Sequence, residues 1–279
     1  MPPWGHCIRT DVRSATAAQG RTLRRVTGPV GPVIVQLSDV HIGSRLGRRH
    51  AAAVDELSRV VAAVAALDVT PDLVLVTGDL VDHGRHDEYV ELLDALDALP
   101  CRYVLVPGNH DDPDVLRGTV ASRTITDDPL ARTVDLGAVR VLTLDSWVAG
   151  WEAGRVGREQ CVWLDGELAG DPRPSIVAVH HPPIAIGHAG LDGMRLVDAD
   201  ALGDVIVRHP NVERVVCGHV HRAITARWSG TIVTAAPSCV RQFAPTFGPE
   251  PSFGVTDEAP AFVVHVWVDG ALASHVVAI

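Results

Sequence analysis

The sequence contains no lysine. All 24 of its basic residues are arginine, and 34 aspartate and glutamate residues outnumber them in a chain of 279 residues. The formal net charge is therefore −10. Proteins that bind long nucleic acids neutralise many phosphates with Lys and Arg. This charge balance disfavours a long nucleic acid as a partner.

Cysteine is scarce and scattered. The five cysteines are odd in number, widely spaced and contain no CxxC pair, so the sequence predicts neither a disulfide framework nor a thiolate zinc site. Free thiols are typical of reducing compartments, and we expect a cytoplasmic protein. The five residues are Cys7, Cys101, Cys161, Cys217 and Cys239.

Long hydrophobic runs are also missing. Residues 1–30 lack the apolar core of a secretory signal, and we interpret them as a mobile N-terminal tail. The apolar stretch 261–279 is interrupted by His265 and Asp269, so it is no membrane span of about 20 apolar residues. The pair Asp269-Gly270 instead predicts a β-hairpin. We expect no membrane partner.

Aliphatic runs alternate with helical patterns in the first half of the chain. Strands are predicted at 33–37, 73–76 and 103–106, with amphipathic helices at 48–67 and 89–99 between them. This β-α-β-α-β order predicts a largely parallel sheet. Further strands are predicted at 133–136, 139–144, 176–179 and 214–217, with helices at 158–169 and 199–208.

The later elements indicate a second sheet, so we expect an α/β protein in which helices flank two sheets. No internal repeat or linker divides the sequence, and we predict one domain over residues 31–279. Three stretches rich in Gly, Pro or Trp are predicted to be long loops, at 146–156, 186–197 and 240–260.

Side chains that bind metals follow five of the predicted strands, at the point where each strand ends. In open α/β sheets this edge is where ligands bind, so the five segments can converge on one crevice. Taken singly, each is more often a solvated turn or a hydrogen-bonded histidine, but five in the same context indicate a metal site. The segments are Asp39-Val40-His41, Gly78-Asp79, Gly108-Asn109-His110-Asp111, His180-His181-Pro182 and Gly218-His219-Val220-His221.

These segments offer only nitrogen and oxygen donors, a set that suits Zn, Mn, Fe or Co. Seven donors are too many for one tetrahedral ion, but two ions about 3.5 to 4 Å apart that share a carboxylate would use them all. Two dications, two carboxylates and a bridging hydroxide leave a charge near +1, which attracts phosphate. The seven candidate ligands are Asp39, His41, Asp79, Asn109, His180, His219 and His221.

This ordered set of motifs, which spans residues 39–221, resembles the calcineurin-like metallophosphoesterases. The resemblance implies a four-layer α-β-β-α sandwich of two mixed sheets, with a dinuclear metal site at the carboxyl ends of the strands. His110 resembles the family's histidine that binds no metal, which contacts the phosphate and can protonate the leaving alkoxide. The implied ligands are Asp39, His41, Asp79 and His221 for one ion, and Asp79, Asn109, His180 and His219 for the other, with Asp79 bridging.

The sequence departs from two branches of this family at positions near the predicted metal ligands. Asp82 stands where purple acid phosphatases carry Tyr, so a tyrosinate-bound ferric ion is not expected. His83 and Pro107 stand where serine/threonine protein phosphatases carry Arg. Because paired guanidiniums clamp phosphomonoesters, their absence favours a diester. The segments at 107–112 and 180–183 most resemble bacterial class III cyclic-nucleotide phosphodiesterases and their glycerophosphodiesterase relatives.

We therefore expect a metal-dependent phosphodiesterase that hydrolyses cyclic nucleotides or small phosphodiesters through attack by a hydroxide bridging the two ions. An alternative is a nucleotide or small pyrophosphate hydrolase, or a nuclease, on the same scaffold. A non-catalytic interaction module is a third hypothesis, which the full ligand set and His110 disfavour. The resemblance is also compatible with a homodimer.

The long loops leave the substrate open. Trp147, Trp151, Phe243 and Phe247 could stack on a base, but aromatic residues just as commonly cover a core or a dimer contact. Arg241 could contact phosphate or ribose, although an arginine in such a loop is ordinarily solvated.

Overall fold

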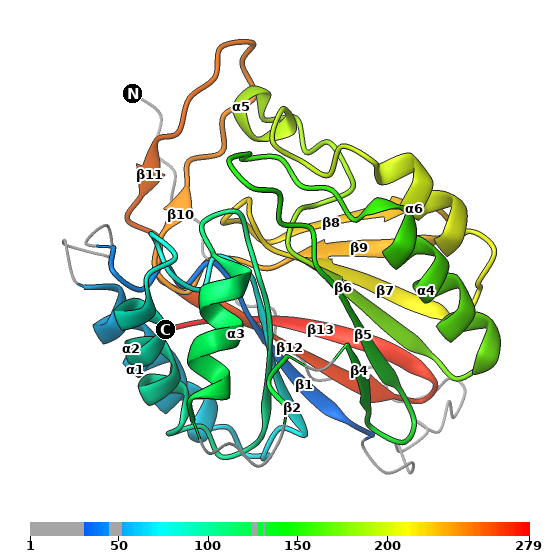
Figure 1. Cartoon of the computed structure of the whole chain (residues 1–279), viewed down its shortest axis with the longest axis horizontal. Coiled ribbons are helices and arrows are strands. Elements are labelled where there is room, and N and C mark those ends of the chain that lie inside the picture. The colour runs from blue at the N-terminus through cyan, green and yellow to red at the C-terminus, as the bar shows by residue number, and fades with distance from the viewer. Residues whose placement is uncertain (1–30, 45–51, 124–127, 131) are drawn as a thin grey trace, which may run out of the picture.

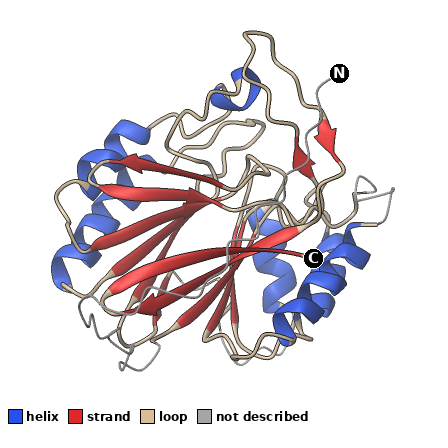
Figure 2. Cartoon of the chain, turned by 180° about the vertical axis from the view of Figure 1, so that it is seen from behind, coloured by secondary structure: helices blue, strands red, loops and turns tan. Residues whose placement is uncertain are grey.

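The computed structural model describes residues 31–44, 52–123, 128–130 and 132–279. The predicted tail at 1–30 and the start of the helix predicted from residue 48 lie outside the described residues. Two sheets pack face to face, and helices cover their outer faces (Figure 1; Figure 2). No helix among the described residues is long and apolar enough to cross a bilayer.

The first sheet has the order β13-β12-β1-β2-β3. Strands β1, β2 and β3 are parallel, as the alternating pattern predicts, whereas β12 runs antiparallel to β1. The predicted hairpin at Asp269-Gly270 is confirmed, since it joins β12 to β13. The bounds are β1 (Val33–Leu37), β2 (Leu73–Thr77), β3 (Tyr103–Val106), β12 (Ala261–Val268) and β13 (Ala271–Ala278).

The second sheet has the order β4-β5-β6-β7-β9-β8. Strands β5, β6, β7 and β9 are parallel, while the edge strands β4 and β8 are antiparallel to their neighbours. Both sheets are therefore mixed. The bounds are β4 (Thr133–Asp135), β5 (Arg140–Leu144), β6 (Ser175–Val179), β7 (Val212–Cys217), β8 (Ile224–Trp228) and β9 (Thr231–Ala235).

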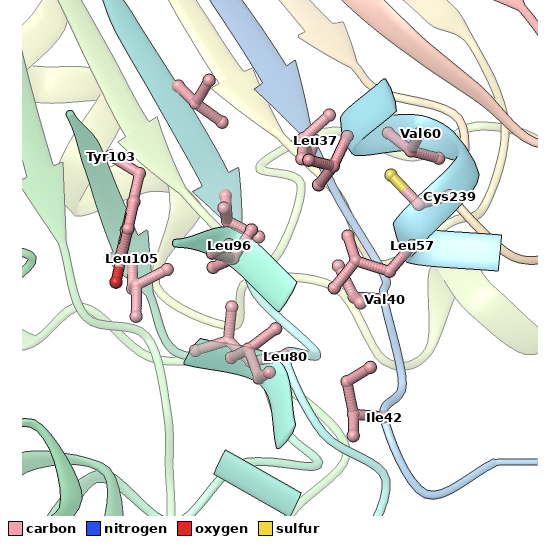
Figure 3. Close-up of a cluster of buried hydrophobic side chains, with 14 of the residues drawn as sticks. Leu37, Val40, Ile42, Leu57, Val60, Leu80, Leu96, Tyr103, Leu105 and Cys239 are labelled. Carbon is pink, nitrogen blue, oxygen red and sulfur yellow. The ribbon is translucent and has the colours of Figure 1, made fainter. Parts of the chain in front are cut away.

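Three hydrophobic cores hold the layers together. One lies between the two sheets, a second joins the first sheet to its helices, and the third joins the second sheet to its own. Figure 3 shows Leu57 and Val60 of α1 and Leu96 of α2 in the second of these cores, with Leu37 and Leu105 of the sheet. The helices are α1 (Ala53–Ala65), α2 (His86–Leu96), α3 (Pro113–Ala121), α4 (Gly157–Gly170), α5 (Ala189–Asp192) and α6 (Ala199–Ile206).

The predicted four-layer α/β sandwich is thus confirmed, with three local corrections. Helix α3 was not predicted; the Asp112 side chain caps it by accepting hydrogen bonds from the backbone N–H groups of Asp114 and Val115. The stretches at 186–197 and 240–260 are not purely loops. The first contains α5, and the second contains β10 (Gln242–Phe243) and β11 (Val255–Thr256), which pair with each other.

A chain of hydrogen-bonded polar groups crosses between the sheets, and its members Gln36 and His265 are buried. Arg214 of β7 donates to the Ser274 hydroxyl of β13, and Ser274 Oγ lies 2.7 Å from His265 Nδ1. His265 Nε2 lies 3.0 Å from Gln36 Oε1, and Gln36 Nε2 donates to the carbonyl of Cys217 at 2.9 Å. Because the Gln36 oxygen can only accept, the neutral His265 ring carries its proton on Nε2.

The buried imidazole predicts a pH dependence of stability. Burial and the Arg214 charge lower the pKa of His265 from its ordinary 6.5 to about 3. Between these values only the unfolded state binds the proton, so the stabilisation is complete above about pH 6.5 and is lost as the pH falls. We expect the loss of unfolding free energy caused by His265→Gln to be about 2 kcal/mol smaller at about pH 5 than at about pH 7.

Urea unfolding of both proteins at the two pH values measures this difference. His275→Gln, on the neighbouring strand but exposed, is the matched control and should show no such dependence. An equal effect of His265→Gln at both pH values would contradict the lowered pKa. It would mean that at about pH 5 the ring is protonated in the folded protein as it is in the unfolded protein.

Candidate metal centre

The seven predicted ligands lie at the carboxyl ends of five strands, and their backbone is unusual there. Five of the seven adopt left-handed conformations with φ between 47° and 70°. Such conformations cost about 1 to 3 kcal/mol each for residues other than glycine, and they persist where surrounding contacts impose them. Strain is thus concentrated at one point of the fold. The five residues are Asp39, His41, Asp79, His219 and His221.

Two motif glycines allow the segments to approach one another. A Cβ atom on Gly108 would lie 2.2 Å from the backbone nitrogen of Asp79 and 2.3 Å from its Oδ1. A Cβ atom on Gly218 would lie 2.0 Å from Ser38 Oγ and 2.7 Å from the Thr77 carbonyl. No side chain fits at either position, so these glycines serve the close packing of the site.

One group of donors is formed by Asp39, His41, Asp79 and His221, all buried, with their ligand atoms within 4.8 Å of one another. The Nε2 atoms of His41 and His221 are 3.1 Å apart. His41 Nε2 lies 3.6 Å from Asp79 Oδ2, and His221 Nε2 lies 3.6 Å from Asp39 Oδ1. These are the four residues that the family resemblance assigns to one ion.

Hydrogen bonds behind the two imidazoles orient their lone pairs. His41 Nδ1 lies 3.0 Å from Asp82 Oδ1, and His221 Nδ1 lies 3.1 Å from the Arg241 carbonyl oxygen. Both partners accept hydrogen bonds, so each neutral ring carries its proton on Nδ1 and turns an Nε2 lone pair into the group. Two lone pairs that face each other at 3.1 Å repel, and a cation between them removes that repulsion.

A second group lies beside the first. Asn109 Oδ1 is 3.2 Å from His180 Nε2 and 3.0 Å from His219 Nδ1. His180 Nε2 is also 3.4 Å from Asp79 Oδ1, while the Thr77 carbonyl accepts from the other ring nitrogen. Asp79 therefore turns Oδ1 toward the second group and Oδ2 toward the first, which is the arrangement of a bridging carboxylate.

Charges in the two groups are strongly perturbed. Burial alone would lower the pKa of His180, but Asp79 and Asp39 raise it to about 9. Burial raises the pKa of Asp79, yet His180 and His41 outweigh it and hold that pKa well below its ordinary value. Burial and the charge of His180 lower the pKa of His219 to about 3. The carboxylates thus draw positive charge into a buried site.

The residues present fit a pair of metal ions. Asp39 Oδ2 and His219 Nε2 are buried and have no hydrogen-bond partner among the described residues. Orphaned buried acceptors are costly. Together with the facing lone pairs and the donor set of imidazole, carboxylate and amide oxygen, they match two divalent cations.

His110 lies at the edge of this centre. Its Nδ1 is 3.1 Å from the Asp82 carbonyl, and its ring meets the His41 ring edge-on at 4.8 Å between centroids. Burial would lower the pKa of His110, but the charge of Asp79 and the hydrogen bond to Asp82 raise it. The ring lines the pocket and can carry a proton to a bound molecule.

Two carboxylates outside the predicted ligand set hold the ligands in place; Asp111 belongs to a predicted motif, whereas the sequence did not point to Glu152. Glu152 Oε2 accepts from Asn109 Nδ2 at 2.9 Å, which leaves the amide oxygen to face His180 and His219. Asp111 Oδ2 accepts from the Gly108 N–H at 2.7 Å and the Leu80 N–H at 3.1 Å, tying two motif segments together. Glu152 is exposed and comes from another loop, so its contact with Asn109 is recognisable only once the loops have folded.

His181 belongs to a group of three histidines whose nitrogens lie close enough to share an ion. Both of its nitrogens already have partners, however: Ser146 Oγ at 2.8 Å and the Glu152 carbonyl at 3.1 Å. The His181 ring therefore anchors the 146–156 loop. Its hydrogen bond to the Glu152 carbonyl holds the loop backbone where the Glu152 side chain lies beside Asn109.

The pocket over the centre has a volume of about 80 Å³. Phe243 lines it and stacks on His221 with 4.3 Å between ring centroids, and Phe253 and Arg241 also line it. Trp151 and Phe247 are exposed, at 50% and 78%. Arg241 is half-buried, and its Nε is fully buried.

Comparison with known proteins adds the family context. The model of the calcineurin-like phosphoesterases matches residues 32–223. A probable glycerophosphodiester phosphodiesterase of Arcobacter nitrofigilis is 29% identical over 244 residues, covering 85% of this chain and 89% of that protein. A probable cyclic nucleotide phosphodiesterase of Rhodococcus erythropolis is 34% identical over 212 residues, covering 74% and 70%.

Among solved structures, a dimetal phosphatase from Danio rerio superposes with a TM-score of 0.62 at 15% identity, covering 90% of this chain and 99% of that one. At this identity the likeness concerns the fold alone. It bears on the two-sheet architecture described above.

Proposed function

The chain belongs to the calcineurin-like phosphoesterase family and is a metal-dependent phosphodiesterase, and from this premise we propose that its substrates are cyclic nucleotides or other small phosphodiesters. The observation that carries the proposal is the double donor group around Asp79, whose two carboxylate oxygens face opposite sides. The relatives named above, which are phosphodiesterases of small molecules, support the same substrate class.

We assign the two ions to the two groups of side chains. Asp39, His41, Asp79 and His221 hold one, and Asp79, Asn109, His180 and His219 hold the other. When bound, a pair of divalent ions supplies positive charge to the phosphate and lowers the pKa of water at the site. Mn, Fe, Zn and Co all suit these donors, and availability in the cytoplasm, where we place the protein, would select among them.

His110 is assigned as the general acid. Its Nδ1 is occupied by the Asp82 carbonyl, so the proton for the leaving oxygen is held on Nε2, on the side of the ring that faces the pocket. Asp79 and Asp82 raise the His110 pKa and so favour the protonated ring that donation requires. Asp82 also orients His41, which gives this carboxylate two positioning tasks.

A paired assay tests the proposal. We expect cleavage of bis(p-nitrophenyl) phosphate to exceed that of p-nitrophenyl phosphate, to rise with added Mn²⁺ and to stop with chelator. The physical reason is that a pair of guanidiniums clamps a phosphomonoester dianion, whereas Arg241 is the one arginine among the described residues that lines this pocket. The Asp79→Ala protein is the blank.

Preference for the monoester would contradict the diester assignment. Absence of metal-dependent turnover of both compounds, combined with cleavage of a nucleoside diphosphate, would favour the pyrophosphate hydrolase in its place.

A further inference from the structure

Arg241 reaches the metal centre from a segment that contributes none of the proposed ligands. It follows β9 and lines the same pocket as His41, Asp79 and His221. The sequence left open whether Arg241 contacts phosphate or is solvated, and the positions at which protein phosphatases carry Arg are His83 and Pro107 here. The fold thus brings one guanidinium to the pocket from the segment after β9.

The backbone of Arg241 is fixed to the metal-ligand segments. Ser238 Oγ donates to the Asp39 carbonyl at 2.8 Å and accepts from the N–H groups of Val240 at 3.0 Å and Arg241 at 3.1 Å. The carbonyl of Arg241 accepts from His221 Nδ1 at 3.1 Å. The backbone of Arg241 is therefore tied through Ser238 to Asp39, which follows β1, and directly to His221, which follows β7.

The side chain, in contrast, lacks a matching partner. Nε of Arg241 is buried without a hydrogen-bond partner among the described residues, and Nη1 is 3.5 Å from Ser44 Oγ. In the described part of the chain no carboxylate forms an ion pair with it. Burial lowers its pKa although Asp82, Asp39 and Asp79 oppose that effect. A partly buried guanidinium whose buried N–H has no acceptor is costly unless a ligand supplies one.

The surroundings indicate which ligand. Arg241 points into a pocket built around metal donors, and guanidinium matches the geometry of phosphate oxygens. A single guanidinium brings one positive charge, which matches the single negative charge of a diester. Apolar side chains of Leu191, Met194, Phe243 and Phe253 line the pocket as well, and they suit the organic part of such a molecule.

We propose that Arg241 binds a non-bridging phosphate oxygen of the substrate and is a specificity-determining residue of this site. The inference rests on the proposed function in that it takes the ligand to be a phosphodiester. Charge-assisted hydrogen bonds contribute enough that their loss weakens binding about tenfold to a hundredfold.

The test compares Arg241→Met with Arg227→Met, an exposed arginine of β8 outside the pocket. We expect Arg241→Met to raise KM for bis(p-nitrophenyl) phosphate about tenfold or more, with a smaller change in kcat. In the metal-loaded protein, calorimetry should show a similar loss of affinity for inorganic phosphate. Metal content and Tm should match those of Arg227→Met.

Arg241→Lys provides the second variant, because it keeps the buried charge but lacks the planar fork. It should bind phosphate with intermediate affinity, and free guanidinium ion should restore part of the affinity of Arg241→Met. Unchanged KM and phosphate affinity in both Arg241 variants would overturn the inference, as would a loss of bound metal in both. Arginine-dependent phosphate binding without any diester cleavage would instead support the inference and refute the proposed function.

Discussion

Replacing Asp79 with alanine is expected to abolish turnover and to leave the protein with less than one bound metal ion per chain. One oxygen of this carboxylate faces His41 at 3.6 Å and the other faces His180 at 3.4 Å, so its removal weakens both proposed ion sites together. A bound ion would lower the pKa of water strongly, and the expected loss in kcat/KM is about 10⁴-fold or more.

Metal analysis of the purified protein and turnover of a diester measure the two effects. Asp204→Ala, which removes an exposed carboxylate of α6, is the matched control and should retain both. Asp79→Asn tests the charge alone, since the amide can still accept the His110 N–H that Asp79 Oδ1 accepts at 3.0 Å. Two ions bound to Asp79→Ala would refute the bridging role.

The His110→Ala variant is expected to keep both ions and to lose about 10²- to 10⁴-fold in kcat on a cyclic nucleotide or a glycerophosphodiester. The alkoxide that leaves from these substrates requires a proton, which we assign to His110 Nε2. With bis(p-nitrophenyl) phosphate the loss should be much smaller, because p-nitrophenolate leaves without protonation.

The ratio of the two losses distinguishes an acid from a residue that only binds substrate. His275→Ala, on the exposed face of β13, controls for the loss of an imidazole elsewhere. Full activity of His110→Ala on the unactivated diester would show that the acid assignment is wrong. Equal losses on both substrates would mean that His110 binds phosphate and transfers no proton.

The strands and the ligand set could be predicted because local signals for them are strong. Buried parallel strands are runs of aliphatic residues, and those predicted at 33–37 and 103–106 agree with β1 and β3. Donors at the carboxyl ends of such strands must meet at one edge, so Asp39 and Asp79 could be placed together without any coordinates. Hairpin chemistry at Asp269-Gly270 was equally local.

The prediction was weaker where packing decides the structure. Strands β10 and β11 contain two residues each, and the paired residues are more than ten positions apart in the sequence. Such short strand pairs depend on the surface against which they pack. Helix α3 was missed although Asp112 and Pro113 form a recognisable start, because no long apolar pattern follows them.

By itself, the sequence determined the order of elements and the two-sheet class, and it predicted seven metal donors and His110, because periodicity and strand ends are local properties of the chain. Only the tertiary structure decided which nitrogen of His41 and His221 faces the centre, that Glu152 holds Asn109, and that the Nε of Arg241 is buried. The physical reason is that burial and hydrogen-bond partners come from segments distant in the sequence. Whether the Nε of Arg241 is exposed to solvent or buried without a partner depends on the segments that the fold packs around it.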